Sequence, residues 1–360
     1  MKAIPLLPVW TIAAPLIGWL LLAGSRLDLG NGYTVLLAVG LLAGVLAAVH
    51  HAEVVAHRVG EPYGTLVLAT AVTAIEVALI VTLMLAGGAA TSALARDAVF
   101  ATVMIILNGI VGLCLLVGGI RFGEQSFTLK GVSASLSTLA AIVVLTLVLP
   151  NYTTATVGPF YSPAQLAFVA VVSLLLYLTF VFVQTIRHRD YFLPAEGAGS
   201  ADEHAPPPSD KVAYISAVLL FACLGAVVLI AKVISPSIEA VVASIGAPNA
   251  LVGVIIAAIV LLPEGVAALR AARSNRLQAS LNLSLGSALA CIGLSVPAVA
   301  IVSLVTGLTL TLGIDVKSTV LLALSLVVAT LSLGTGRTTI LQGAVHLVIF
   351  AVYLFLTVVP

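Results

Sequence analysis

The chain has 360 residues, of which 61% are hydrophobic and only 8% are charged. A soluble globular domain carries about 25% charged residues, so this composition excludes a water-soluble fold and indicates a chain embedded in hydrocarbon. Inside a bilayer the backbone polar groups must be hydrogen-bonded within the protein, which favours helices. The net charge of +1 gives no support for nucleic-acid binding.

Apolar stretches long enough to cross a bilayer recur along the whole chain, since about 20 apolar residues suffice for one crossing. Eleven such stretches predict an all-α polytopic membrane protein. The predicted spans are residues 9–24, 33–57, 64–87, 97–119, 131–150, 164–186, 212–232, 248–270, 277–306, 315–333 and 339–359.

The one long polar stretch is residues 187–211, which is rich in charge and holds three consecutive prolines. This composition is typical of an extended linker. Cytoplasmic loops of membrane proteins are enriched in lysine and arginine, and eleven of the 15 basic residues fall on one side of the predicted spans. The bias predicts a bacterial inner-membrane protein with its N-terminus and linker in the cytoplasm and its C-terminus outside.

The linker separates two parts with equal numbers of predicted helices. We expect an extra N-terminal helix in residues 1–30, a first five-helix repeat in residues 31–186 and a second in residues 212–360. Halves with an odd number of helices insert with opposite orientation, as in the inverted repeats of secondary transporters. Such repeats place the substrate site near the bilayer midplane.

Two glutamates lie inside predicted spans, where an ionisable group is costly. Glu76 is in the third span and Glu264 is in the eighth, so they occupy matching places in the two repeats. An inverted repeat would bring both to the centre. Two carboxylates can bind a hard cation such as Ca²⁺, or each can take a proton instead. The alternative is a structural role, in helix caps or interhelical hydrogen bonds.

Other polar groups supplement the two glutamates. Pro263 frees a backbone carbonyl one turn earlier, although a packing kink is the alternative interpretation. Glu53 and His57 are predicted to line the cytoplasmic entry, and His346 of the last span is interpreted as a packing histidine. Single polar residues in a span are more often interhelical hydrogen bonds than ligands. The candidate additional ligands are Thr73, Asn108, Asn282 and Ser287.

Two stretches of sequence resemble the α-repeats of the cation/Ca²⁺ exchanger superfamily in its cation/proton branch, above all the bacterial ChaA-type sodium/calcium–proton antiporters. The stretches are AEVVAHRVGEPYGTLVLATAVTAIEVALIV and LLPEGVAALRAARSNRLQASLNLSLGSALACIGLSVP. The family motif GNxxE ends on a glutamate that binds the cation and exchanges protons. The resemblance implies these roles for Glu76 and Glu264, and implies that the second and seventh spans slide to alternate access.

The motif itself is changed in this chain. Its Gly and Asn are replaced by Val72 and Thr73 in the first repeat, and by Val260 and Leu261 in the second. In the helix after each motif, the family's Asn is kept as Asn108 in the first repeat, and its Gly-Ser is kept as residues 286–287 in the second. The site therefore has fewer side-chain oxygens than is typical of the family, which leaves room for Na⁺ or K⁺.

We therefore expect a secondary active antiporter that exports Ca²⁺, with Na⁺ or K⁺ as alternatives, in exchange for H⁺ by alternating access. It would need no cofactor, and its partners would be inorganic cations, protons and the lipid bilayer. A passive cation channel is the competing hypothesis. It differs from an antiporter in that it would conduct the cations down their gradient without moving protons. The sequence has no HExxH or GxSxG pattern of a hydrolase, so we expect no enzyme activity.

Overall fold

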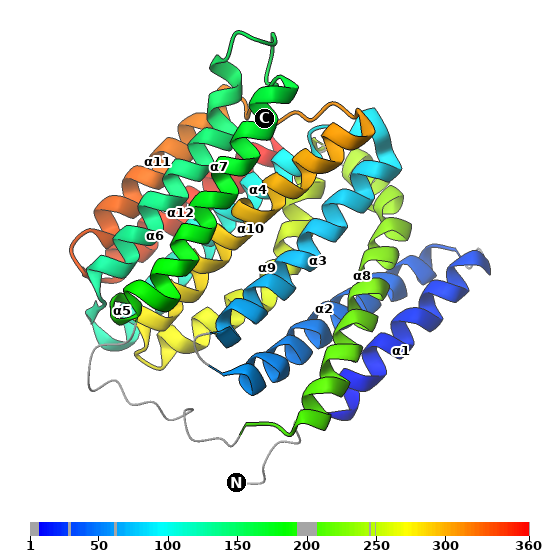
Figure 1. Ribbon diagram of the computed structural model, residues 1–360, viewed down its shortest axis with the longest axis horizontal. Coiled ribbons are helices and arrows are strands. Elements are labelled where there is room, and N and C mark those ends of the chain that lie inside the picture. Colours follow the sequence, from blue (N-terminus) through cyan, green and yellow to red (C-terminus); the bar gives the residue numbers. More distant parts are fainter. Residues whose placement is uncertain are drawn as a thin grey trace. The chain divides into compact units, whose positions relative to one another are not determined.

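The structure is a computed structural model that describes residues 7–27, 30–60, 63–192, 207–244, 246–248 and 250–359. Nearly all of the described chain is helical (Figure 1). Eleven stretches within these residues are long and apolar enough to cross a membrane. The prediction of a polytopic all-α membrane protein is therefore confirmed.

The helical elements follow one another with short connections. The first four spans are α1 (Val9–Gly24), α2 (Asn31–Val59), α3 (Tyr63–Gly87) and the continuous series α4 (Leu94–Met104), η3 (Ile105–Ile110) and α5 (Val111–Phe122). The next two are α6 (Leu129–Val143) with η4 (Val144–Val148) and η5 (Leu149–Tyr152), and α7 (Pro163–Phe182) with η6 (Val183–Arg187). The last five are α8 (Asp210–Ser244), α9 (Ala250–Arg273), α10 (Leu277–Thr306), α11 (Val316–Leu333) and α12 (Ile340–Val358).

The observed bounds lie close to the predicted spans except at α8. This helix continues to Ser244, twelve residues beyond the predicted end at residue 232. Pro236 lies inside it and removes one backbone hydrogen bond, but the helix carries on past the proline. The hydroxyl of Ser235, the residue before this proline, donates at 3.0 Å to Oε1 of Glu239, which lies one turn further along the helix. A single missing donor therefore does not end this helix.

The predicted linker, residues 187–211, falls largely on residues 193–206, which lie outside the described part of the chain. Before this gap, η7 (Arg189–Tyr191) lies against α6, where Lys130 Nζ is 4.8 Å from the centre of the Tyr191 ring. After the gap, Asp210 begins α8 and accepts a hydrogen bond of 2.7 Å from Arg58 Nε of α2.

Contacts divide the chain into two compact units that do not follow the order of the predicted repeats. The first unit comprises residues 1–86 and 200–246 and holds α1, α2, α3 and α8. The second comprises residues 87–199 and 247–360 and holds the remaining helices. The repeat boundaries at residues 31–186 and 212–360 stay a prediction.

In the first unit, α1 packs on both α2 and α8 (Figure 1). Pro15 inside α1 has no backbone N–H, so the carbonyl of Thr11 lacks its helical donor. His51 of α2 lies where it can supply one, with Nε2 3.0 Å from Thr11 O. Trp19 Nε1 donates to Ala222 O of α8 at 3.1 Å. These bonds fix the extra N-terminal helix to two neighbours.

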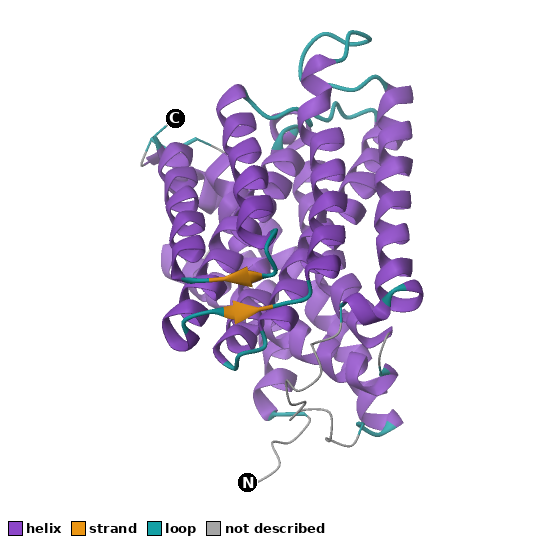
Figure 2. Cartoon of the chain, turned by 90° about the vertical axis from the view of Figure 1, so that its left-hand side faces the viewer, coloured by secondary structure: helices purple, strands orange, loops and turns teal. Residues whose placement is uncertain are grey.

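In the second unit, loops of one predicted repeat pair with loops of the other. Strand β1 (Gln125–Ser126), before α6, pairs antiparallel with β2 (Arg337–Thr338), after α11 (Figure 2). At the opposite ends of these helices, the N–H groups of Leu312 and Gly313 donate to Pro159 O. The strand pairing joins the loop after the third helix of the first predicted repeat to the loop after the fourth helix of the second. The contacts of Pro159 join the loop after the fourth helix of the first predicted repeat to the loop after the third helix of the second. This exchange is what an inverted two-fold relation between the predicted repeats would produce.

Candidate ion-binding site

Glu264 lies in the middle of α9 and is only 8% exposed. The hydroxyl of Ser287 on the neighbouring helix α10 donates to Glu264 Oε2. Pro263, the residue before this glutamate, leaves the carbonyl of Ile259 without its helical donor. The second unit therefore combines a buried carboxylate, a hydroxyl bound to it, and a freed backbone carbonyl one turn away.

Glu76 is the matching carboxylate of the first unit. It lies in the middle of α3 and is 3% exposed, while Thr73 is 4% exposed. Residues three apart on a helix lie on one face, so α3 presents a carboxylate and a hydroxyl together. These are the donor types that α9 and α10 present in the second unit.

Asn108 lies in η3, a π-helical turn, and both polar ends of its side chain are hydrogen-bonded. Its Nδ2 donates to Ser325 Oγ of α11 at 2.9 Å, and its Oδ1 lies 3.1 Å from His346 Nδ1 of α12. Ser325 was missed in the sequence, where a serine inside a span marks an interhelical bond but does not name its partner. The structure thus brings Asn108 together with His346, which the sequence presented only as a packing residue.

Asn282 also makes contacts that support the fold. Its Nδ2 donates to Phe192 O, and its Oδ1 accepts from Gln278 Nε2 at 2.9 Å. Gln278 in turn accepts from the backbone N–H of Thr128 at 2.6 Å. This network fastens the start of α10 to the segments before α6 and after η7. Of the four candidate additional ligands, Ser287 contacts a glutamate and Thr73 shares a face with one.

Glu53 and His57 lie one turn apart on α2, and both are exposed. Arg58 beside them pairs with Asp210 at the start of α8. The predicted role of Glu53 and His57 at a cytoplasmic entry stays a prediction.

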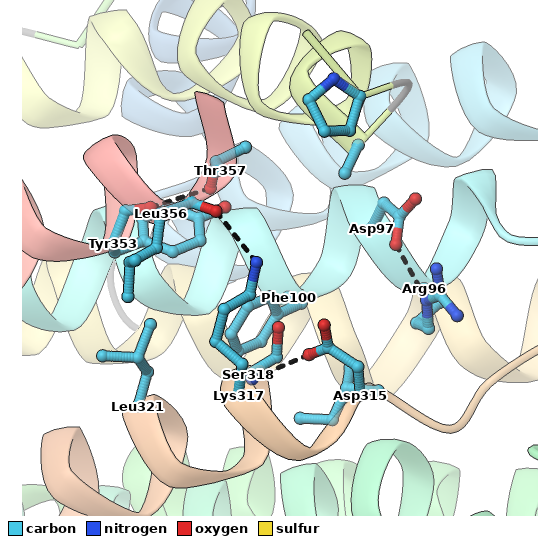
Figure 3. Close-up of a pocket in the computed structure, with 13 residues that line it drawn as sticks. Arg96, Asp97, Phe100, Asp315, Lys317, Ser318, Leu321, Tyr353, Leu356 and Thr357 are labelled. Carbon is cyan, nitrogen blue, oxygen red and sulfur yellow. Dashed lines mark hydrogen bonds and ion pairs between the residues drawn. The ribbon is translucent and has the colours of Figure 1, made fainter. Parts of the chain in front are cut away.

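A pocket of about 190 Å³ opens among the ends of α4, α9, α11 and α12 in the second unit (Figure 3). Arg96 Nε donates to Asp97 Oδ1 at 2.8 Å. Lys317 Nζ donates to Leu356 O near the end of α12 at 2.9 Å, where a cation also complements the helix dipole. In this pocket Lys317 thus joins the start of α11 to the end of α12, Arg96 and Asp97 form an ion pair within the first turn of α4, and Asp315 caps α11.

Asp315 lies just before α11 and accepts from the backbone N–H of Ser318 at 2.7 Å, which caps the helix. Burial by itself would raise the pKa of Asp315. The hydroxyl and N–H of Ser318 and the charges of Lys317 and Arg96 outweigh burial and hold this pKa below its ordinary value. The carboxylate is therefore ionised at neutral pH.

The profile of the sodium/calcium exchanger protein family matches residues 30–186 and 215–359. The chain belongs to this family. The match begins after α1 and is interrupted over the predicted linker, so it follows the division of the sequence into an extra helix and two parts. Glu76 and Glu264 each fall within one of the two matched segments.

Relatives and solved structures agree with the family. The chain is 47% identical over 357 residues to y4hA of Sinorhizobium fredii, which is named for ionic transport, covering 98% of this chain and 97% of y4hA. It is 37% identical to the sodium-potassium/proton antiporter ChaA of Escherichia coli, covering 88% of this chain and 86% of ChaA.

Two solved structures have the same fold. YfkE superposes with a TM-score of 0.74 at 18% identity, over 98% of this chain and 99% of YfkE. The H⁺/Ca²⁺ exchanger CAX superposes with a TM-score of 0.72 at 13% identity, over 96% of this chain and 87% of CAX.

Proposed function

We propose that the chain is a secondary active cation/proton antiporter in which Glu76 and Glu264 bind a cation and protons in turn. The observation that carries this proposal is that each unit has, among its described residues, one buried carboxylate on a helix apolar enough to span a membrane. A buried carboxylate is costly unless it is protonated or paired. Each glutamate therefore favours a proton-bound or a cation-bound state over the empty one. A site of this kind exchanges a bound cation for protons.

Na⁺ and K⁺ are the cations that we place first, ahead of the Ca²⁺ expected from the sequence. Ca²⁺ takes about six to eight oxygen ligands, and the side-chain oxygens of Asn108 and Asn282 are already engaged in hydrogen bonds. The relative from Escherichia coli is named a sodium-potassium/proton antiporter. Ca²⁺ is the second candidate, because a relative from Bacillus subtilis, 25% identical over 50% of this chain, is named a Ca²⁺/H⁺ antiporter.

The family and the eleven apolar helices support a multi-pass protein of the bacterial inner membrane. We further propose that the N-terminus is cytoplasmic and the C-terminus lies outside. The excess of lysine and arginine in alternate loops supports this orientation. Alternating access of the site to the two sides is part of the same proposal.

The test is exchange in reconstituted vesicles that contain a pH-sensitive dye. A pH gradient is imposed, and Na⁺, K⁺ or Ca²⁺ is added in turn. We expect cation-dependent proton movement that is lost in Glu76→Gln and in Glu264→Gln, because an amide of the same shape cannot carry the proton or the charge.

Glu239→Gln is the matched control. Glu239 of α8 also accepts from a serine hydroxyl, as Glu264 does, but it is exposed. The control variant should exchange at the wild-type rate. Cation flux without proton movement would favour the channel, and normal exchange in Glu264→Gln would refute the assigned role of that glutamate.

A further inference from the structure

A hydrogen-bonded series joins α12, η3 and α11 through three side chains, His346, Asn108 and Ser325, each fully buried. Ser325 Oγ donates its one hydrogen to Leu321 O at 2.7 Å, so it accepts from Asn108 Nδ2 at 2.9 Å. The amide nitrogen of Asn108 is thereby assigned to the side of α11. Its oxygen must then face His346.

This polarity also assigns the proton on the imidazole. Asn108 Oδ1 can only accept, so the 3.1 Å contact requires a hydrogen on His346 Nδ1. A neutral imidazole carries a single N–H, and here it is used on Asn108. The other nitrogen, Nε2, is buried and has no hydrogen-bond partner among the described residues. Among the described residues, the hydrogen bond to Asn108 is therefore the one that orients the imidazole.

The sequence makes room for this contact one turn beyond Asn108. Gly112 follows it by four residues and faces the same helix, α12. A Cβ at Gly112 would lie 2.8 Å from the Cβ of His346, closer than carbon atoms pack. The missing side chain lets α12 approach close enough for the imidazole to reach the amide.

The opposite side of η3 contacts α9 beside Glu264. Ile110, the last residue of η3, has its Cδ1 3.3 Å from the Cβ position of Gly265, the residue after Glu264. A π-helical turn holds an extra residue and is frequent at functional sites. In η3, Asn108 thus faces α11 and α12 while Ile110, two residues later, packs on α9.

From this arrangement we propose that His346 is a positioning residue for cation exchange. By holding the amide of Asn108, it keeps the π-helical turn η3 in place against α9, and so keeps Glu264 in its cation-binding position. The inference rests on the proposed role of Glu264. His346 itself does not touch the cation.

The test compares His346→Leu, His346→Asn and His346→Gln in vesicles, with Na⁺ and with K⁺ as the transported ion. Asparagine places an N–H near the position of Nδ1, whereas the amide of glutamine reaches toward the position of Nε2. We expect His346→Leu and His346→Gln to raise the half-saturating cation concentration about two- to tenfold, the range for loss of one neutral hydrogen bond. The maximal rate should stay near wild type, and His346→Asn should restore the wild-type concentration.

His51→Leu is the matched control, since His51 is also fully buried and contacts a single oxygen, but in the first unit. It should lower the melting temperature as His346→Leu does, without changing the half-saturating concentration. In the double variant with Asn108→Leu, adding His346→Leu should have no further effect, because both act through one contact.

Several results would overturn the inference. These are a half-saturating concentration in His346→Leu equal to that of the control, failure of His346→Asn to restore it, or additive effects in the double variant. The proposed function is tested separately by Glu264→Gln. If wild-type protein exchanges ions and Glu264→Gln does not, while His346→Leu equals the control, only the positioning role fails.

Discussion

Removing the Ser287 hydroxyl should weaken cation binding through Glu264. Ser287 donates to Glu264 Oε2 from the neighbouring helix, and both side chains are buried. A hydrogen bond to a charged group contributes about 1.5–3 kcal/mol, and about 1.4 kcal/mol corresponds to a tenfold change in an equilibrium constant. Ser287→Ala should therefore raise the half-saturating Na⁺ concentration for proton exchange at least about tenfold.

The matched control is Ser284→Ala, the same substitution one turn earlier on α10. Ser284 is also buried, but its hydroxyl donates to Ser280 O of its own helix at 2.8 Å. Exchange is measured in vesicles as dye response against Na⁺ concentration, with protein amount and orientation matched. The control should keep the wild-type curve. If Ser287→Ala and Ser284→Ala give the same curve, the contact with Glu264 takes no part in cation binding.

Three further predictions concern stability, measured as thermal unfolding in detergent. Asp315→Ala removes the N-cap of α11 and should lower the free energy of unfolding by about 1 kcal/mol at pH 7. Because the pKa of Asp315 is lowered on folding, this difference should hold above the ordinary aspartate value of about 3.9 and shrink progressively as the pH falls below it toward the lowered pKa; a difference that does not shrink below this value would contradict the prediction. Gly343→Ala should destabilise, since its Cβ would lie 2.3 Å from Leu116 N, whereas Gly286→Ala should not, since no described atom lies within 4 Å of its Cβ position; equal melting temperatures would refute this. His51→Leu should lower the melting temperature while exchange continues, because α1 lies before the family match; complete loss of exchange would show that α1 is required.

Composition and hydropathy predicted the spans well, because a membrane helix needs a long apolar run and little else. The bounds of α10, for instance, coincide with the predicted residues 277–306. The exception was α8, which was predicted to end at Lys232 but continues past Pro236 to Ser244. Neither residue ends a helix by itself, and the continued apolar run after them kept α8 intact.

The two glutamates could be chosen from sequence because a buried charge stands out in an apolar span. The hydrogen-bond partners of the candidate amides, Asn108 and Asn282, could not be predicted from the sequence. Asn108 binds Ser325 and His346, which lie 217 and 238 residues away in the chain. Such pairing depends on how helices pack and on the π-helical turn at η3, which rotates Asn108 toward α11 and α12. Neither feature leaves a periodic signal in one sequence.

The most direct test of the account is whether a cation gradient alone drives protons uphill. Vesicles containing the protein are prepared with equal pH on both sides, a high internal Na⁺ concentration and the membrane potential clamped at zero. An antiporter must acidify the interior as Na⁺ leaves, and Glu76→Gln and Glu264→Gln must not, whereas Glu239→Gln must. Loss of Na⁺ from wild-type vesicles with no change in internal pH would contradict the account and establish a passive pathway.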